Sequence, residues 1–117
     1  MRSEIMYVEL KGTSGVTGDA RIGLVTFSKT GKTMYFDGRT LEPARDGGGK
    51  INHVDADTGE EFWVSGCKKA GGDTLYPGTI KIDADVREEY WRDIRHEPGR
   101  ATETTIRSLG KHNKHSQ

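Results

Sequence analysis

The residue best suited to covalent chemistry in this sequence is its single cysteine, Cys67. Two lysines follow it, and neighbouring cations lower the pKa of a thiol and make it more nucleophilic. A nucleophile also needs a general base within hydrogen-bonding distance. The only histidines before residue 100 are His53 and His96, and no feature of the sequence brings either of them to Cys67. We therefore expect a half-buried structural cysteine and assign no catalytic residue.

The acidic segment between Asp55 and Glu61 (DADTGEE) is the best candidate for a metal site. A calcium-binding EF-hand loop needs glycine at its sixth position and a carboxylate at its twelfth position. Counted from Asp55, those positions hold Glu60 and Gly66, so the segment meets neither requirement. No two of the four histidines fall at a spacing typical of a metal pair together with Cys67. We expect a charged turn here, and we predict neither a metal site nor a cofactor.

Phosphate binding is a third possibility, because Gly31-Lys32-Thr33 matches the end of a nucleotide-binding P-loop. Such a loop also needs a glycine five residues before the glycine-lysine pair and a helix after it. Thr26 holds the first of these positions, and Met34-Tyr35-Phe36 is a poor start for a helix. The pattern therefore predicts a plain β-turn.

A binding surface remains as the fourth possibility. Lys29, Lys32 and Arg39 lie close in sequence to Tyr35. Small β-barrels bind single-stranded nucleic acid by stacking bases on exposed aromatic rings beside a cationic groove. The alternative is that the lysines are solvated at the tip of a hairpin, while the aromatic rings belong to the core.

Trp91 extends this candidate surface. If the neighbouring Tyr90 faces the core, Trp91 lies about 100° further round a helix and is partly exposed. Exposed tryptophan is enriched at the energetic centres of protein interfaces. The alternative, that Trp91 covers an edge of the sheet and closes the core, is left open. The predicted binding surface consists of Lys29, Lys32, Tyr35, Arg39 and Trp91.

Composition limits the kind of protein that can present this surface. The chain has 117 residues, of which 32% are hydrophobic and 31% are charged, which fits one small domain with a modest core. Eighteen basic residues balance eighteen acidic ones, so no global charge attracts nucleic acid or membranes. With one cysteine, no signal-peptide pattern and no apolar run near ~18 residues, we expect a cytoplasmic protein without membrane contact.

A central hairpin is the element around which we expect the fold to form. Residues 21–28 and 33–41 are rich in β-branched and aromatic types and predict two strands joined by a tight turn at 29–32. Apolar side chains occupy both faces of the first strand, with Ile22 and Leu24 on one face and Val25 and Phe27 on the other. Burial on both faces indicates a curled sheet, as in a small barrel, or a sheet covered by a helix.

Further strands complete the predicted sheet. They are a strand at 5–11, a second hairpin over 51–66 with its turn at 57–60, and a strand at 74–82. Glycine-rich loops at 12–19 and 42–50 separate these elements.

One helix is predicted, over residues 85–96. Asp85 is a suitable N-cap, and Glu88 completes a capping box three residues later. The inward-facing positions recur at four-residue spacing and would lie on the sheet. They are Val86, Tyr90 and Ile94.

These elements together predict an α+β fold that is mostly antiparallel β. We expect a small curled sheet or barrel of about five strands with one C-terminal helix. Residues 1–99 should form a single compact domain, and residues 100–117 a polar, flexible tail.

Three segments of the chain resemble a group of small bacterial proteins of uncharacterised function. They are residues 21–41 (RIGLVTFSKTGKTMYFDGRTL), 57–69 (DTGEEFWVSGCKK) and 82–95 (IDADVREEYWRDIR). The resemblance covers about residues 5–95 and implies a single compact cytosolic domain. It implies no activity, cofactor or catalytic residue.

The function that we predict from the sequence is a non-catalytic protein-interaction or regulatory module that binds a protein partner or a second copy of itself. The alternative is a small β-barrel that binds nucleic acid through the basic segment 29–50. We do not expect an enzyme, although the sequence leaves that class open.

Overall fold

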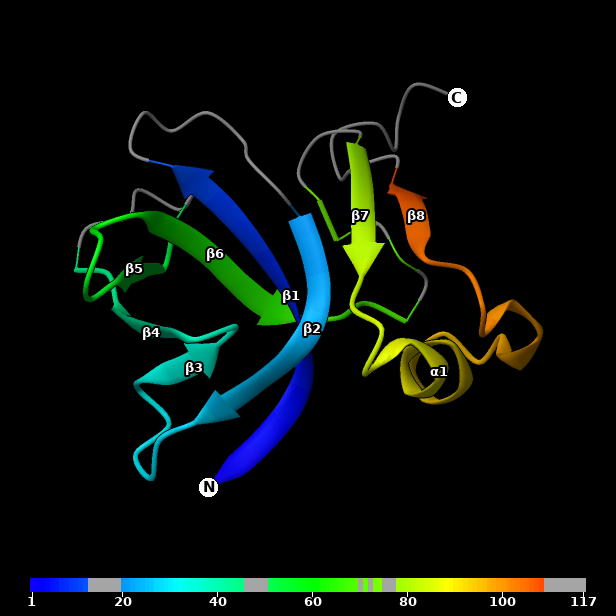
Figure 1. The fold of residues 1–117 in the computed structure, drawn as a ribbon, viewed down its shortest axis with the longest axis horizontal. Helices are drawn as coiled ribbons and strands as arrows, with labels where there is room; N and C mark the ends of the chain where they lie inside the picture. Colours follow the sequence, from blue (N-terminus) through cyan, green and yellow to red (C-terminus); the bar gives the residue numbers. More distant parts are fainter. Residues whose placement is uncertain (13–19, 46–50, 70, 72, 75–77, 109–117) are drawn as a thin grey trace.

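The computed structural model describes residues 1–12, 20–45, 51–69, 71, 73–74 and 78–108 (Figure 1). These residues form eight strands and a short helical segment. The strands are β1 (Arg2–Gly12), β2 (Ala20–Phe27), β3 (Met34–Phe36), β4 (Arg39–Pro43), β5 (His53–Asp55), β6 (Glu61–Gly66), β7 (Gly78–Ile82) and β8 (Thr105–Ser108). The helical segment consists of α1 (Arg87–Glu89), a π-helical turn (Tyr90–Ile94) and a 3₁₀ turn (Pro98–Arg100).

The first six strands form a closed antiparallel barrel. Each strand pairs with the next one in sequence, and β1 pairs with both β2 and β6, which closes the ring (Figure 1). Side chains alternate between the inside and the outside of such a barrel. The inward-facing side chains form the barrel core, which consists of Val8, Val25, Phe27, Phe36, Leu41, Phe62 and Val64.

A second unit, the flank, is attached to the outside of the barrel at β2. We define the flank as residues 78–108, which contain β7, the helical segment and β8. Arg21 and Ile22 of β2 pair with β7 in parallel, whereas Thr26 and Phe27 of the same strand pair with β3. One edge of β2 is therefore shared between the barrel and the flank.

Gly23 lies at the point where this edge divides. A Cβ atom there would approach Oδ2 of Asp83 and Cε1 of Phe36 to 2.5 Å. Glycine lets two parts of the backbone and side chains approach closely where no other residue fits. The absence of a side chain at this position lets β7 join β2 beside β3.

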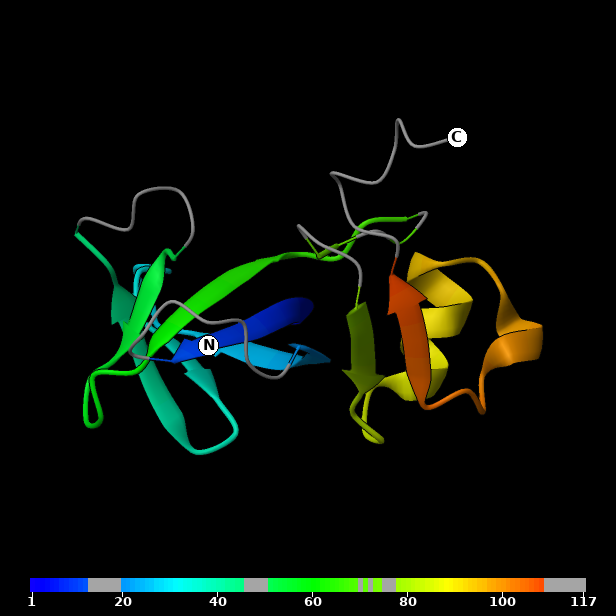
Figure 2. The same ribbon diagram turned by 90° about the horizontal axis from the view of Figure 1, so that it is seen from above.

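The flank has its own core, which lies against the outside of β1 and β2. Figure 2 shows β7, β8 and the helical segment beside the barrel, with the helical segment behind β8. The flank core consists of Tyr7, Ala20, Ile22, Ile80, Ile82, Val86, Tyr90, Trp91 and Ile106. Both strands β1 and β2 are thus buried on two faces along part of their length.

The predicted mostly antiparallel β fold and its barrel are confirmed, but the number of strands is higher than expected. The predicted strand 33–41 is in fact two strands, β3 and β4, joined at Asp37-Gly38. Both residues have positive φ, 52° for Asp37 and 77° for Gly38. This is the backbone of a type I′ hairpin turn, for which Asp-Gly is a preferred sequence.

The predicted helix exists but differs in its start and its geometry. Val86 rather than Asp85 is the N-cap, and no side-chain hydrogen bond caps it, so the expected capping box is wrong. From Tyr90 the backbone widens, and the N–H of Arg95 donates to the carbonyl of Tyr90 at 3.0 Å. In this π-helical turn two successive aromatic residues, Tyr90 and Trp91, both face the core.

Part of the predicted flexible tail belongs to the fold. Residues 105–108 form β8, and Ile106 is buried in the flank core, which corrects the expectation for these residues. Three other expectations concern residues that the structure does not describe. They are the flexible tail at 109–117, most of the loop at 12–19 and the glycines at 47–49. Within the described part of the chain, no helix is long and apolar enough to cross a membrane.

Candidate functional site

The predicted binding residues do not lie on one surface. Lys29 and Lys32 are exposed on the turn between β2 and β3, and Tyr35 points outward from β3 with 40% of its surface exposed. The other two predicted residues, Arg39 and Trp91, lie elsewhere. The sequence analysis grouped Arg39 with the lysines because they are close in the chain. It grouped Trp91 with them because a regular α-helix was assumed around this residue.

Trp91 is completely buried in the flank core. Its indole Nε1 donates a hydrogen bond to the carbonyl of Glu103 at 3.1 Å. The guanidinium group of Arg100 lies 4.1 Å from the centre of its ring. The expected partial exposure is therefore wrong, and the alternative, in which Trp91 closes the core, describes its position.

Arg39 lies at the mouth of the barrel, where its positive charge is neutralised. Its Nη1 donates to Oδ2 of Asp55 at 2.7 Å and to Oε1 of Glu60 at 2.8 Å. Its guanidinium group also lies 5.1 Å from the centre of the Phe62 ring. The hydrogen bonds with Glu60 and Asp55 raise the pKa of Arg39 above its usual value. Arg39 is thus part of a fixed ion-pair group.

Six uncharged outward-facing residues of β1 to β4 form a surface that we call the outer face, and the exposed carboxylate of Glu42 on β4 lies at its edge. Register pairs place Ser3 opposite Thr26, Thr26 opposite Tyr35, and Tyr35 opposite Thr40. The hydroxyl groups of Ser3 and Thr26 are hydrogen-bonded at 2.9 Å. The outer face consists of Ser3, Ile5, Leu24, Thr26, Tyr35 and Thr40.

Two large apolar side chains are exposed on the outer face. Leu24 is 43% exposed and Tyr35 is 40% exposed, and they lie on neighbouring strands. Apart from Met1, no other large hydrophobic residue is exposed in the part of the chain that the structure describes. A group of uncharged residues with an exposed leucine and tyrosine has the composition of the centre of a protein interface.

Lys29 and Lys32 lie at one end of the outer face, on an ordered turn. The N–H of Gly31, whose φ is 79°, donates to the carbonyl of Ser28 at 2.9 Å. The N–H of Thr33 donates to the hydroxyl of Ser28 at 3.2 Å. Neither lysine forms an ion pair with a described residue, so both charges are available to a partner.

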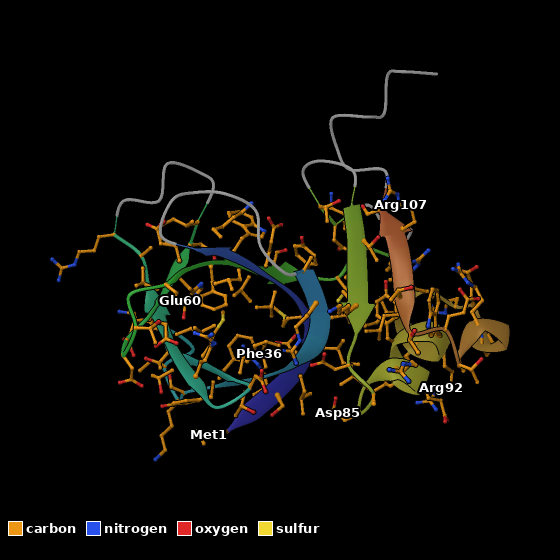
Figure 3. The ribbon with its side chains drawn as sticks, turned by 45° about the horizontal axis from the view of Figure 1, so that its top comes forward. Met1, Phe36, Glu60, Asp85, Arg92 and Arg107 are labelled. Carbon is orange, nitrogen blue, oxygen red and sulfur yellow. The ribbon has the colours of Figure 1, made fainter. Side chains whose placement is uncertain are left out.

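A pocket of about 210 Å³ opens at the opposite end of the barrel. Its lower part is lined by apolar side chains and its rim by charged ones. The lining residues are Val8, Leu10, Arg21, Phe36, Asp37, Arg39 and Phe62. Figure 3 shows Phe36 inside the ring of barrel strands and Glu60 at its edge. The strand ends and the β3–β4 turn position these side chains.

Arg21 forms the second ion-pair group at this mouth. Its Nε and Nη2 donate to the two carboxylate oxygens of Asp83 at 3.0 and 2.7 Å. Its Nη1 donates to Oδ2 of Asp37 at 2.8 Å, and its guanidinium group lies 4.7 Å from the centre of the Phe36 ring. Arg21 therefore connects the barrel, the β3–β4 turn and the start of the helical segment.

Burial shifts the pKa values of both Cys67 and His53 away from their ordinary values. Cys67 packs against the flank core, and burial, with a smaller contribution from Asp73, raises its pKa to about 12. The expected effect of the following lysines is thus outweighed by burial. His53 lies on β5, and its burial lowers its pKa. At neutral pH the thiol is protonated and the imidazole is neutral.

The acidic segment forms a turn, as predicted. Oδ1 of Asp55 accepts hydrogen bonds from the N–H groups of Asp57 at 2.8 Å and Thr58 at 3.2 Å. These backbone hydrogen bonds and Arg39 lower the pKa of Asp55. Among the described residues, no three His, Cys, Asp or Glu side chains are arranged to hold a metal ion.

The pocket residues Arg21, Phe36 and Asp37, and Asp83 next to them, were not predicted as a site. Their proximity depends on the division of the β2 edge, which brings Asp83 from the end of β7 to Arg21. Only the Asp37-Gly38 turn signal could have indicated part of this arrangement.

The functions of the two candidate surfaces, the outer face and the pocket, are therefore inferred from their geometry alone. No protein-family model, curated protein or solved structure matches this chain.

Proposed function

We propose that this chain is a non-catalytic interaction module that binds a protein partner through the outer face of the barrel. The observation that carries this proposal is the pair formed by Leu24 and Tyr35. Both are exposed on neighbouring strands, among the uncharged residues of the outer face, with Glu42 at its edge. Apolar surface of this kind gains free energy when a partner removes it from water, at about 25 cal/mol per Å².

The rigidity of the outer face supports this role. Leu24 and Tyr35 lie on paired strands of a closed barrel rather than on loops. Residues that are already ordered lose little conformational entropy on binding, so more of the contact energy appears as affinity. Tyrosine adds a large contact area with few rotatable bonds.

The two lysines define the chemistry of the partner. Lys29 and Lys32 lie on the turn at one end of the outer face and have no ion-pair partner among the described residues. Charges at the rim of an interface accelerate association with a surface of opposite sign and make it dependent on salt. The proposed partner therefore presents an apolar centre with acidic residues at one side.

The test starts with an affinity purification from the cells of origin, with and without nuclease. The partner is then purified, and its affinity is measured for the wild type, Leu24→Asp and Thr79→Asp. Thr79 is exposed on β7, away from the outer face, so Thr79→Asp is the matched control. We expect a loss of at least about tenfold for Leu24→Asp only, because a buried unpaired charge is costly. Equal affinities for all three proteins would refute the proposal.

Nucleic-acid binding is the second candidate, favoured by the position of Lys29 and Lys32 next to an exposed Tyr35. The arrangement is weaker than the sequence indicated, because Arg39 points into an ion-pair group at the other end of the barrel. Binding of a single-stranded oligonucleotide is measured as a function of salt. If this function is right, Lys29→Glu with Lys32→Glu flattens the slope of log K against log salt by about 1.4. An unchanged slope would exclude it.

A further inference from the structure

The pocket at the barrel mouth is not used by the proposed function and lies on a different surface from Leu24 and Tyr35. Its lower part is formed by Val8, Leu10 and the rings of two phenylalanines. Its volume of about 210 Å³ exceeds that of a cavity of about 150 Å³ that holds benzene. A single planar ring system therefore fits into it.

The walls of the pocket are held in place before any ligand arrives. The guanidinium groups of Arg21 and Arg39 lie over the rings of Phe36 and Phe62, at 4.7 and 5.1 Å from the ring centres. Each guanidinium group is also held by two carboxylates. Polar groups that are fixed in this way are typical of binding sites, because they need no reorganisation on binding.

The rim offers both a hydrogen-bond donor and an acceptor. Arg39 makes its two ion pairs through Nη1, and its Nε and Nη2 have no partner among the described residues. Oδ2 of Asp37 accepts from Arg21, whereas its Oδ1 has no described partner, and 60% of the side chain is exposed. A ligand with an acceptor and a donor along one edge would satisfy both residues.

Charge decides between an anionic and a neutral ligand. Two guanidinium groups interact with four carboxylates at this mouth, so the group carries a formal charge of −2. A phosphate or carboxylate would be repelled by this excess of negative charge. The ligand therefore brings no anionic group near the rim.

We propose that this pocket binds an uncharged purine or pyrimidine base, as the free base or a nucleoside. The planar ring contacts the apolar lower part of the pocket. A carbonyl of the base accepts a hydrogen bond from Arg39, and an amino or ring N–H group donates to Asp37. The sugar remains at the open mouth, in solvent.

The test is a titration of the ¹⁵N-labelled protein with adenosine, guanosine, cytidine and uridine, followed by NMR. We expect at least one nucleoside to shift the amide signals of Val8, Leu10 and Phe36 in a saturable way. The matching 5′-monophosphate should bind several-fold more weakly, because its phosphate approaches the carboxylates. No shift with any nucleoside at about 10 mM, above the range of weak specific affinities, would refute the proposal.

Three variants make this test specific. Arg39→Lys keeps the positive charge for Asp55 but lacks the planar donor set, so binding should weaken at least about fivefold. Asp37→Asn tolerates the left-handed turn and removes one negative charge, so it should reduce the discrimination against the monophosphate. Lys32→Ala, on the far turn, is the control and should bind like the wild type.

A folded Arg39→Lys protein, verified by its amide spectrum, that binds as well as the wild type would contradict the proposal. Shifts that cluster at Leu24 and Tyr35 instead of the pocket would contradict it as well. Neither result bears on the outer face as a protein-binding surface, so the two proposals fail independently.

Discussion

The barrel and the flank use the same two strands, β1 and β2, in different ways. The barrel takes their inward-facing side chains, such as Val25, and holds them within a closed ring of hydrogen bonds. The flank takes outward-facing ones, such as Ile22, and is joined to β2 through a parallel pairing at Arg21 and Ile22. The barrel is thus closed by backbone pairing around its whole ring, whereas the flank is joined to the barrel by one short parallel pairing and by side-chain packing.

The carboxyl groups of the two regions also differ in the direction of their pKa shifts. At the barrel mouth, Asp55 and Glu60 are paired with Arg39, and their pKa values are lowered. Under the flank, Asp73 is buried, one of its carboxylate oxygens has no described hydrogen-bond partner, and burial raises its pKa. The environment at the barrel mouth therefore favours the ionised form of its carboxylates, whereas burial beside the flank disfavours the ionised form of Asp73.

The largest effect is expected for Trp91→Ala, which should destabilise the protein by ~3–5 kcal/mol because it empties a fully buried site. The loss should be concentrated in the flank. Hydrogen exchange should show faster exchange for the amides of β7 and β8 than for those of β3 and β4. Alkylation of Cys67, which packs against the flank core, should also become faster.

Leu41→Ala is the matched change in the barrel, where Leu41 is also fully buried. It should cost ~2–5 kcal/mol and should expose all strands together, because a closed barrel has no edge from which to open. If both variants changed the exchange rates of both regions alike, the flank would not be a separate unit of stability.

A smaller effect than that of either core truncation is expected for Gly23→Ala at the junction of the two regions. Its Cβ would lie 2.5 Å from Oδ2 of Asp83 and from Cε1 of Phe36, both of which are held in place. Overpacking of this kind costs ~1–3 kcal/mol. Urea denaturation measures the loss, and Gly66→Ala is the control, because nothing lies within 4 Å of a Cβ there. Equal stabilities of the two variants would show that the junction is not tightly packed.

This junction explains how much of the fold could be predicted from the sequence. The pattern of Ile22 and Leu24 against Val25 and Phe27 correctly indicated a strand with apolar residues on both faces, and hence a curled sheet or a covered one. The structure contains a curled sheet, which is the barrel, and a covered one, where the flank packs on β1 and β2. What the pattern could not give was the partner on each face, because β7 lies more than fifty residues away and pairs in parallel. Such long-range pairing leaves no local signal.

The errors in the candidate site have two physical causes. Trp91 was placed on the surface because a 3.6-residue period was assumed, whereas the turn is π-helical. Arg39 was grouped with Lys29 and Lys32 by proximity in sequence, but the unrecognised turn at Asp37-Gly38 reverses the chain. In both cases one local backbone feature changed the direction of a side chain.

The opposite pKa shifts of Asp73 and Asp55 predict opposite pH dependences of the stability. Asp73 has a raised pKa when folded, so its contribution to stability is full below the ordinary value of 3.8 and is lost as the pH rises through the folded pKa. Asp55 has a lowered pKa, so its contribution is present above 3.8 and is lost as the pH falls through the folded pKa.

Asp73→Asn should therefore flatten the decline in stability above pH 4, and Asp55→Asn should flatten the decline on the acidic side. Urea unfolding between about pH 2.5 and pH 8 measures both slopes, which are independent of any constant offset caused by the amide. If both variants altered the slope on the same side, the opposite directions of the two pKa shifts would be wrong.

The smallest effect is expected when a residue of β2 that the flank covers is compared with a residue of β2 that is exposed. Ile22→Val and Leu24→Val each remove one methylene group from an outward-facing residue of β2. Ile22 is fully buried under the flank, so its loss should cost ~0.5–1.5 kcal/mol. Leu24 is 43% exposed, and valine favours strands, so its change should stay within ~0.5 kcal/mol of zero.

Because the two changes delete the same chemical group, their difference measures the coverage by the flank. Repeating both in the Trp91→Ala protein sharpens the comparison. If the flank has detached there, Ile22 is exposed like Leu24, and the difference between the two variants should shrink toward zero. A difference that persists would mean that Ile22 is buried by the barrel strands themselves, and that the flank packs on β2 without Trp91.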